Sequence, residues 1–551
     1  MPVLRFKPGR VKEALGLSLD KALEVMERLK IEVELDAEGN VIAELEVDRP
    51  DMYSLEGIAR QAKGLLGLEL GMPNYEIVES GYRIVVEDVP TRPYVAGAVV
   101  WDVDVDEDFL EELIQFQEKL HTSHGGQRRR VAIGLHDLDK LPSRNVFYRF
   151  MDVDKVVFKP LHHEREMTLR EVLEETSQGK SYGSISLQDG KHPVLFSGEE
   201  VISVPPVINA DLTRIEPGTR HIFIDVTGPE LKPVLDILSI LAANLAERSK
   251  SKKIGVVDVE APWGRLREPS LEPMTMVLNP EYASRIIGTS ITADDTVEAL
   301  KRMRFDARKV NVSHVEVEVP RYRVDILHPV DLVEEIALAI GLDRLAPEKP
   351  RLMLRGSLLP IRAWEREARL ILVGHGFVEV YSYSLTSCKD QIELAGIDEK
   401  RLVIIENPVG VESGCYRASL LPLLLRIAAA NQHAVPLRVF EIGDVIVASE
   451  EDKERGIAHQ RRVALLYMGE KAGYEDIQSV VYSVLRLLGD EITEVVPANH
   501  RLFIEGRTAE LRTRRGVVAV LGEVKPEILE KLGVTYPIAA AEIDYTALQR
   551  K

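Results

Sequence analysis

The sequence predicts an α+β protein built from several domains. Its 551 residues, 45% hydrophobic and 29% charged, have the composition of ordinary globular proteins. A prior of about 150 residues per domain suggests three or four domains. Strand-like runs alternate with helical runs along the chain, and two segments rich in Pro and Gly, 261–269 and 346–360, are candidate boundaries.

Residues 1–88 are expected to form an N-terminal α/β module. Its predicted elements are a helix, a strand pair and a second helix, over roughly residues 18–30, 31–47 and 54–66. Ser54 suits the N-cap of the second helix, and Gly67 and Gly71 suit its end.

Residues 89–262 are expected to form a β-rich mixed domain. The strand-like runs YVAGAVVWDVDV and HIFIDVTG alternate with helical ones such as FLEELIQFQEKL, and a long helix over roughly 233–248 ends the region. Gly179, Lys180 and Ser181 are reminiscent of a phosphate-binding loop, but Glu174 stands where that loop needs glycine. We therefore expect a turn there.

The rest of the chain divides into a compact unit, 268–346, and a final α/β unit, 356–551. In the final unit, apolar residues recur at i, i+3, i+4, i+7 and i+11, the spacing of one helix face: Ile477, Val480, Val481, Val484 and Leu488. Such a stripe is most simply core packing, and we assign it no chemistry.

Charge and cysteine content exclude some classes of protein. With 89 acidic and 70 basic side chains the net charge is −19, which argues against a uniformly basic nucleic-acid binder but not against a local basic patch. Cys388 and Cys415 are too few for a disulfide framework and lack zinc-site spacing, so we expect an intracellular, cytoplasmic protein. No apolar run reaches 18 residues, so we expect no membrane span.

A cluster of acidic residues is the first candidate site. Asp325, Asp331, Glu334 and Glu335 lie within eleven residues, and Asp331 could cap a helix that carries both glutamates. One interpretation is a set of capping and solvated acids. The other is a site for a hard cation such as magnesium, because close carboxylates repel one another unless a cation neutralises them.

Two further stretches have polar residues beside turns. A turn at 48–51 precedes the second helix, on which Glu56 and Arg60 are spaced to pair. Ser203, Asp225 and Thr227 lie near the ends of strand-like runs, where small-molecule sites tend to form, although turn chemistry explains the same residues.

Ordered motifs along nearly the whole chain resemble the beta subunits of phenylalanyl-tRNA synthetases, in the shorter archaeal and eukaryotic form. These motifs are RPDMYSLEGIAR, VAIGLHDLDKL, GKSYG, HPVLFSGEEVISVPPVIN, FIDVTG, RYRVDILHPVDLVEEIALAIGLDRL, ENPVGVESGCYRASLLPLLLRIAAANQ and LRVFEIGDVIV. The resemblance implies an editing (beta3/beta4-type) domain at 89–262, a small magnesium-associated domain of winged-helix-like character at 268–346, and a class II synthetase-like antiparallel-sheet module at 356–551.

The resemblance also implies a function. Family members form a tetramer of two alpha and two beta chains that attaches phenylalanine to tRNA with ATP and magnesium, and the alpha chain holds the activation site. Where a working class II centre has an arginine-x-glutamate pair, this sequence has Arg417, Ala418 and Ser419, and no G-x-G-x-x-R follows near its end. The resemblance therefore implies a catalytically inactive final module.

Editing is the chemistry that the resemblance assigns to this chain. A pocket for phenylalanine rejects tyrosine only about a hundredfold in comparable cases, so a second, hydrolytic site that reads the phenol hydroxyl is needed. Matching blocks give a set of pocket residues, to which we add a histidine in GLHDLD: Leu195, Ser203, Asp225, Thr227 and His136. A positioned water would make a dedicated general base unnecessary.

The resemblance assigns the four carboxylates to magnesium shared with the alpha subunit, which favours the metal interpretation for Asp325, Asp331, Glu334 and Glu335. Two rival functions stay open: a stand-alone hydrolase of mischarged tRNA, and a structural scaffold whose editing pocket has decayed. Candidate tRNA contacts are the basic run 127–130 and the cluster 248–253.

Overall fold

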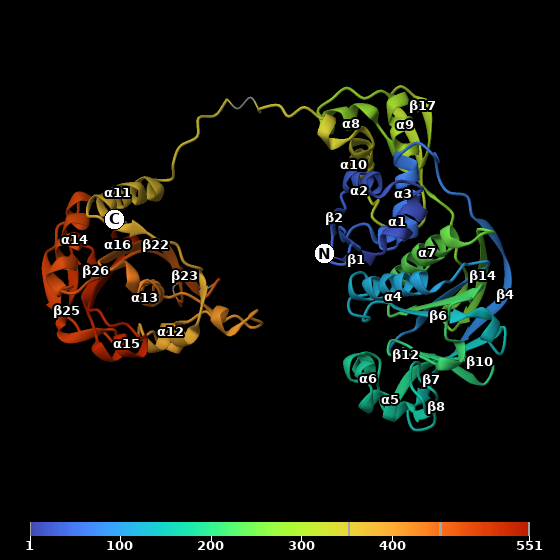
Figure 1. The fold of residues 1–551 in the computed structure, drawn as a ribbon, viewed down its shortest axis with the longest axis horizontal. Coiled ribbons are helices and arrows are strands. Elements are labelled where there is room, and N and C mark those ends of the chain that lie inside the picture. Colours follow the sequence, from blue (N-terminus) through green and yellow to red (C-terminus); the bar gives the residue numbers. More distant parts are fainter. Residues whose placement is uncertain (1, 351–352, 451–453, 549–551) are drawn as a thin grey trace. The chain divides into compact units, whose positions relative to one another are not determined.

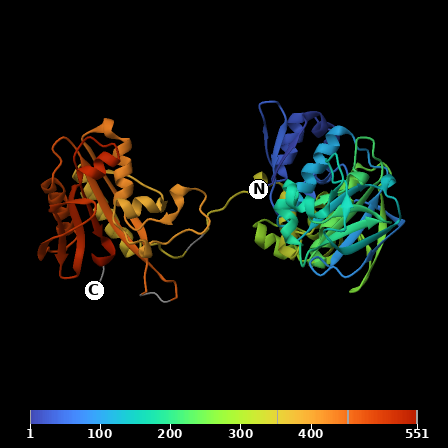
Figure 2. The same ribbon diagram turned by 90° about the horizontal axis from the view of Figure 1, so that it is seen from below.

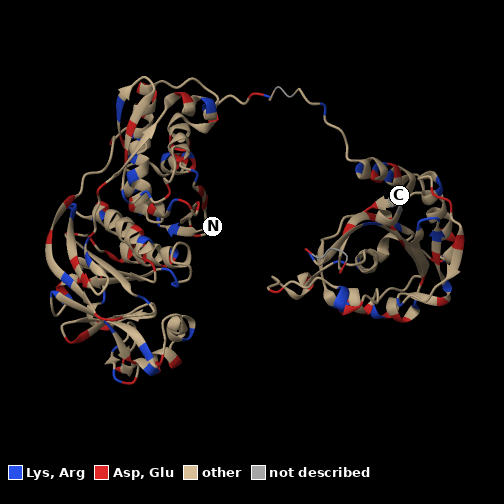
Figure 3. Cartoon of the chain, turned by 180° about the vertical axis from the view of Figure 1, so that it is seen from behind, with Lys and Arg blue, Asp and Glu red and all other residues tan. Residues whose placement is uncertain are grey.

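The fold is taken from a computed structural model, which describes residues 2–350, 353–450 and 454–548 (Figure 1). The chain forms two compact units, Met1–Lys349 and Pro350–Lys551. Within the described ranges, no helix is both long enough and apolar enough to cross a bilayer. Acidic and basic residues are interspersed along the elements of each unit (Figure 3).

The N-terminal segment combines a three-stranded sheet, of order β1-β3-β2, with helices. Its elements are β1 (Val3–Phe6), α1 (Pro8–Leu15), α2 (Leu19–Arg28), β2 (Glu32–Leu35), β3 (Val41–Glu44) and α3 (Leu55–Leu65). The predicted cap is confirmed, because the Ser54 hydroxyl accepts a hydrogen bond from the Gly57 N–H. Figure 2 shows this dark blue segment at one side of the cyan and green elements.

A ten-stranded sheet dominates the first unit. Its strands are β4 (Glu76–Val86), β5 (Tyr94–Val100), β6 (Ala132–Asp137), β7 (Asn145–Asp152), β10 (Lys191–Ser197), β11 (Glu200–Val204), β12 (Ile208–Asn209), β13 (Ile222–Gly228), β14 (Lys253–Ala261) and β15 (Gly264–Glu268). The order is β12-β11-β10-β7-β4-β14-β5-β13-β6, with β15 paired to β14. The two end strands meet, because the Asn209 amide on β12 donates to the Leu135 carbonyl on β6 at 3.3 Å. The sheet therefore curls back on itself.

Each strand presents two different faces. On β13, Ile222, Ile224 and Val226 join the core that contains α4 (Glu107–Thr122) and α7 (Leu231–Arg248). Phe223 belongs to a second apolar cluster on the opposite face of the sheet. Because side chains alternate between the two faces along a strand, Asp225 and Thr227 lie on this same face. Figure 1 shows α4 and α7 lying along the same side of the sheet.

A small subdomain follows β7. It holds β8 (Val157–Phe158), β9 (Met167–Thr168), α5 (Leu169–Glu175) and α6 (Ser177–Tyr182). The turn that we expected at Gly179–Ser181 is wrong, because these residues lie inside α6. Thr176 starts this helix by accepting a hydrogen bond from the Gly179 N–H.

The last part of the first unit is a three-stranded sheet, of order β16-β18-β17, with three helices. Its elements are β16 (Met274–Leu278), α8 (Pro280–Ile287), α9 (Ala293–Arg302), β17 (Asp306–Asn311), β18 (His314–Val319) and α10 (Pro329–Ile340). The N-cap of α10 is His328, not Asp331 as expected. Asp331 stands at the third helical position and reaches back to the cap.

The second unit is built on a seven-stranded sheet of order β19-β22-β23-β27-β26-β25-β24, antiparallel except for the β19–β22 pair. Its strands are β19 (Val378–Glu379), β22 (Leu437–Ala448), β23 (Ile457–Met468), β24 (Glu494–Pro497), β25 (Phe503–Thr513), β26 (Gly516–Val524) and β27 (Ile538–Asp544). A separate pair is formed by β20 (Leu385–Thr386) and β21 (Cys415–Tyr416).

Helices cover both faces of the seven-stranded sheet. They are α11 (Pro360–Gly374), α12 (Cys388–Glu393), α13 (Leu421–Ala430), α14 (Tyr474–Leu487), α15 (Pro526–Lys531) and α16 (Tyr545–Leu548). Val463 and Leu465 of β23 pack with α11 and α14, whereas Ala464 and Leu466 pack with α13 and α15. The predicted stripe on α14 is core, since Ile477, Val480, Val481 and Val484 are buried.

Candidate functional site

The curled sheet gathers the five predicted pocket residues on one face. They come from four strands: His136 from β6, Leu195 from β10, Ser203 from β11, and Asp225 and Thr227 from β13. Leu195 pairs directly with Ser203 and belongs to the apolar cluster of Phe223, which shares a face with Asp225 and Thr227. All five side chains are buried.

His136 and Asp225 form the centre of this group. Nε2 of His136 lies 2.8 Å from Oδ2 of Asp225, and its Nδ1 lies 2.7 Å from the hydroxyl oxygen of Thr213. A neutral imidazole satisfies both contacts when Nε2–H donates to the carboxylate and Nδ1 accepts from the threonine. The second oxygen of Asp225, Oδ1, is buried and has no hydrogen-bond partner among the described residues.

Gly134 makes the contact between His136 and Asp225 possible. It pairs with Asp225 across the β6–β13 ladder. A Cβ atom added to Gly134 would lie 1.9 Å from Oδ2 of Asp225 and 2.9 Å from Nε2 of His136. Sequence reasoning missed this residue, although a glycine inside a strand often marks such a close approach.

Arg92 is a second residue that sequence reasoning missed. Its side chain is 1% exposed, and it donates to the Thr227 hydroxyl oxygen at 2.9 Å and to the Thr227 carbonyl at 2.8 Å. Burial lowers the pKa of this guanidinium to about 10, which Tyr148 and Asp225 partly oppose. The Thr227 hydroxyl oxygen therefore already accepts one hydrogen bond. Nothing in the local sequence pattern separates Arg92 from a surface arginine.

A cavity of about 660 Å³ opens where β12 meets β6. Ser203 and Gly134 line it, together with Asn209, whose side chain accepts a hydrogen bond from the Ser203 hydroxyl at 2.9 Å. The guanidinium of Arg128 stacks 4.4 Å from the ring centre of Tyr182 in its wall. His136, Leu195, Asp225 and Thr227 are not part of its lining.

The four predicted metal ligands line a second, smaller cavity of about 150 Å³. Its other charged walls are Lys30, Glu46, Asp48 and Arg49. Six carboxylates and two cationic side chains therefore surround this space. The four acidic residues therefore lie around one cavity, close together as we expected from the sequence.

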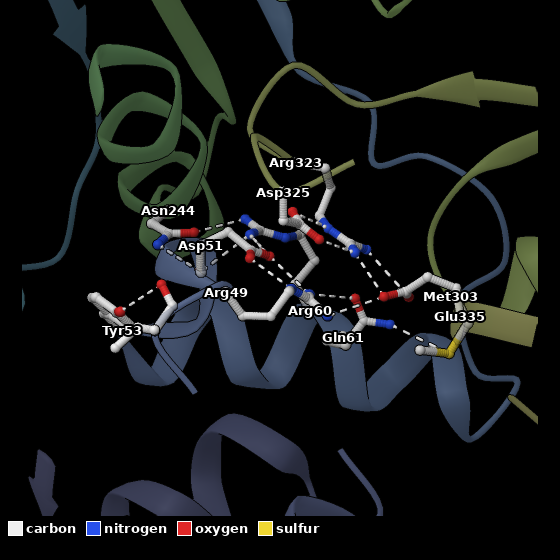
Figure 4. Close-up of polar contacts among 11 residues, drawn as sticks. Arg49, Asp51, Tyr53, Arg60, Gln61, Asn244, Met303, Arg323, Asp325 and Glu335 are labelled. Carbon is white, nitrogen blue, oxygen red and sulfur yellow. Dashed lines mark hydrogen bonds and ion pairs between the residues drawn. The ribbon is translucent and has the colours of Figure 1, made fainter. Parts of the chain in front are cut away.

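Basic side chains already hold two of these carboxylates. Arg323, 3% exposed, donates to both oxygens of Asp325 at 2.9 and 2.6 Å and to both oxygens of Glu335 at 3.3 and 2.7 Å (Figure 4). Arg49 lies 3.5 Å from Glu335 and also binds Asp51. Sequence reasoning missed Arg323, which stands only two residues before Asp325.

The other two carboxylates have separate partners. Asp331 accepts hydrogen bonds from the N–H groups of Leu327 and His328 at 2.8 and 2.7 Å, and Glu334 pairs with Lys30 at 2.7 Å. In the part of the chain that the structure describes, no three His, Cys, Asp or Glu side chains converge to hold a metal ion. As they stand, the four residues do not fit a metal held by this chain alone.

The turn before α3 belongs to the same buried network. Arg60 donates to the Asn244 side chain on α7 at 2.8 Å and lies 3.5 Å from Asp51 (Figure 4). The expected pair of Glu56 with Arg60 is wrong, because Glu56 lies 3.6 Å from Arg10 instead. The network joins the N-terminal segment to α7 and to the region of Arg323.

In the second unit, residues 417–419, which we compared above with an arginine-x-glutamate pair, have structural contacts. Arg417 is buried and donates to Glu441 at 2.6 Å. The N–H groups of Ala418 and Ser419 donate to the Gln391 side chain, and the Ser419 hydroxyl donates to Glu542. These contacts hold the segment within the core of the unit.

Comparisons with known proteins cover the whole chain. Two family models match, the phenylalanyl tRNA synthetase beta chain CLM domain over residues 347–545 and the tRNA synthetase B5 domain over 276–342. The phenylalanine-tRNA ligase beta subunit of Aeropyrum pernix is 43% identical over 100% of this chain and 99% of that protein. The corresponding protein of Sulfurisphaera tokodaii is 38% identical over 98% of each.

Solved structures are also similar to this chain, and one of them covers its first unit. It is an N-terminal fragment of the phenylalanyl-tRNA synthetase beta subunit from Pyrococcus horikoshii, with a TM-score of 0.58 and 31% identity. The match covers 62% of this chain and 99% of the fragment.

Proposed function

The chain belongs to the family of phenylalanine-tRNA ligase beta subunits, and we propose that it assembles with two alpha chains and a second beta chain into a cytoplasmic ligase that charges tRNA with phenylalanine. Activation with ATP then takes place on the alpha subunit. The contact of Arg417 with Glu441 supports an activation site on the alpha subunit, because an arginine held in the core of this chain is not free to bind a nucleotide. In this proposal residues 356–551 are an inactive class II synthetase-like module, and 268–346 form a winged-helix-like domain.

The chain's own proposed reaction is hydrolysis of tyrosyl-tRNA. The observation that carries it is Oδ1 of Asp225, which is buried and has no hydrogen-bond partner among the described residues. Asp225 lies two residues after Phe223 on β13, and Phe223 belongs to the same apolar cluster as Leu195. A phenol hydroxyl that donates to Oδ1 satisfies this acceptor, whereas phenylalanine leaves it unpaired. A buried unpaired acceptor costs about 1–3 kcal/mol, which favours tyrosine over phenylalanine.

The cavity at the sheet seam is the proposed entry for the end of the charged tRNA. Its polar lining includes Ser203 and Asn209, and its wall carries the Arg128–Tyr182 stack, which suits a nucleotide. Gly134 lines the cavity and pairs with Asp225 across the β6–β13 ladder. Both ring nitrogens of His136 are engaged, so its proposed role is to orient Asp225 and not to act as a general base. A positioned water then attacks the ester carbonyl.

The decisive experiment is co-expression with the alpha chain, followed by sizing of the product and a deacylation assay on tyrosyl-tRNA. The proposal expects a complex of both chains that hydrolyses tyrosyl-tRNA and spares phenylalanyl-tRNA. A stand-alone deacylase would hydrolyse tyrosyl-tRNA without the alpha chain. A scaffold would not hydrolyse it even in the complex, and failure to form a complex would overturn the main proposal.

Magnesium binding at the small cavity stays a prediction. Its support is the excess of carboxylates over basic side chains around one space. Because those carboxylates already have partners in this chain, the prediction requires the alpha subunit to complete the site. No step of the proposed hydrolysis depends on it.

A further inference from the structure

The chain contains only two cysteines, and the second unit places them side by side. Cys415 is buried on β21, directly across from Thr386 of β20. Cys388 follows Thr386 by two residues, at the first position of α12. It is partly buried and packs on the small cluster that contains Cys415 and Ala418.

Contacts with their neighbours place the two cysteine side chains close together. A Cβ atom added to Gly414, the neighbour of Cys415, would lie 3.2 Å from Sγ of Cys388. The Cys415 thiol donates to the Thr386 carbonyl at 3.7 Å. Burial, followed by interaction with the Cys388 thiol, raises the pKa of Cys415 to about 12. Cys415 is therefore protected, and Cys388 is the sulfur that solvent reaches first.

We propose that Cys388 and Cys415 are a redox modification site, which a low-molecular-weight disulfide oxidises to an intrachain disulfide bond. The Cys388 thiolate, its proton lost to solvent, attacks one sulfur of the oxidant and breaks its S–S bond, releasing one thiol. Cys415 then loses its proton and attacks the Cys388 sulfur, releasing the second thiol. The pair is oxidised by two electrons, and the oxidant is reduced to two thiols.

The bond would close a loop from α12 to β21 that carries the exposed residues Val409 and Val411. It would tie the start of α12 covalently to the β20–β21 pair. The competing interpretation is that both thiols are small apolar residues that fill a core and stay reduced. The two interpretations differ in whether the sulfur atoms react with each other or with solutes.

The test exposes the full-length chain to oxidised glutathione, denatures it and labels free thiols with maleimide before intact-mass measurement. We expect the oxidised wild type to take up no maleimide and no glutathione and to lose the mass of two hydrogen atoms. Reduction with dithiothreitol should restore two labelling sites. A glutathione adduct on wild-type Cys388, or two free thiols after oxidation, would overturn the proposal.

Matched serine variants separate bond formation from side effects. Cys415→Ser should leave Cys388 to form a glutathione adduct, and Cys388→Ser should leave Cys415 with one maleimide. Oxidation should raise the unfolding temperature of the second unit in the wild type by roughly 5–10 °C, because the bond restricts the unfolded chain. The same oxidation should produce no shift in either variant. An equal shift in the double variant Cys388→Ser/Cys415→Ser would also overturn the proposal.

Discussion

The Nε2 atom of His136 lies 2.8 Å from Oδ2 of Asp225, and both side chains are almost fully buried. This contact fixes one oxygen of the carboxylate and leaves the other without a partner among the described residues. A buried acceptor in this state is costly unless a ligand or a water satisfies it. Oδ1 of Asp225 can therefore accept a hydrogen bond from a hydroxyl group, which is the contact that the proposed editing function requires.

Replacing Asp225 with asparagine tests this site. The Asp225→Asn side chain keeps its shape but loses its charge and turns a donor toward His136 or the pocket. We expect hydrolysis of tyrosyl-tRNA by the assembled ligase to fall about a hundredfold, with charging of phenylalanine unchanged. The measurement is deacylation of tyrosyl-tRNA beside an aminoacylation assay.

Asp104→Asn is the matched control, because Asp104 is an exposed carboxylate in the same region that pairs with Arg220. It should edit at the wild-type rate. If Asp225→Asn also edits at that rate, Asp225 does not bind the substrate hydroxyl.

Gly134→Ala should disturb the same site from the backbone. The new methyl group would overlap Oδ2 of Asp225, so either the carboxylate or the strand must shift. Overpacking of this kind costs about 1–3 kcal/mol. We expect a lower free energy of unfolding in urea and a loss of deacylation.

Gly9→Ala provides the control for glycine replacement. Gly9 lies in α1, and nothing stands within 4 Å of an added Cβ. This variant should keep its activity and gain up to about 1 kcal/mol, since alanine is the better helix former. If Gly134→Ala also keeps its activity and its stability, the close packing around Asp225 is not needed for deacylation.

The sequence predicted elements well where a local pattern is complete. The cap at Ser54 and the apolar stripe on α14 both depend on residues within a few turns of one another, and both are confirmed. The turn expected at Gly179 is wrong because the absence of a phosphate-loop motif says nothing about helix formation, which Thr176 promotes as an N-cap.

The contacts within the candidate site could not be predicted from the sequence, because they join residues that lie far apart in it. His136 and Asp225 meet through strand register, which sets two residues 89 positions apart beside each other. No local spacing encodes that register. Arg92 reaches Thr227 from the segment before β5, 135 positions away in the sequence. Arg323 shows that a buried cation can neutralise Asp325 and Glu335 from within the chain.

Arg323→Met should destabilise the first unit strongly. It removes the cation between Asp325 and Glu335, so that the buried Glu335 and the partly buried Asp325 lose their main partner. Breaking such a pair costs about 3–5 kcal/mol. Arg308→Met is the control, because its pair with Glu316 is exposed and should contribute less than about 1 kcal/mol. Urea unfolding measures both, and equal effects would contradict a structural role for Arg323.

Magnesium retention can be tested where a substitution does not damage the core. Glu334 is half exposed, so Glu334→Ala should fold normally yet lower the magnesium content of the assembled ligase. Lys30→Met should raise it, because Lys30 competes with a cation for Glu334. Elemental analysis of the purified complex measures both. Unchanged content in both variants would leave the four carboxylates with capping and ion-pair roles only.

The last prediction concerns pH and Glu112. Glu112 and Glu56 share Arg10 in a buried cluster, with Nη2 of Arg10 3.2 Å from Glu112 and 3.6 Å from Glu56. Burial and, second, the nearby Glu56 charge raise the pKa of Glu112 to about 7, although Arg10 opposes this shift. Burial raises the pKa of Glu56 as well. Two carboxylates around one arginine favour keeping one of them protonated.

A raised carboxyl pKa makes the folded state bind the proton more tightly than the unfolded chain does. The contribution of Glu112 to the free energy of unfolding should therefore be fully present below pH about 4.5 and fall as the pH rises toward about 7, by roughly 3 kcal/mol at most. Glu112→Gln should flatten this slope in urea titrations at several pH values. Glu13→Gln is the control, since Glu13 also pairs with Arg10 but is exposed, and it should leave the slope in place. A wild-type slope in Glu112→Gln would assign the pH dependence to other groups.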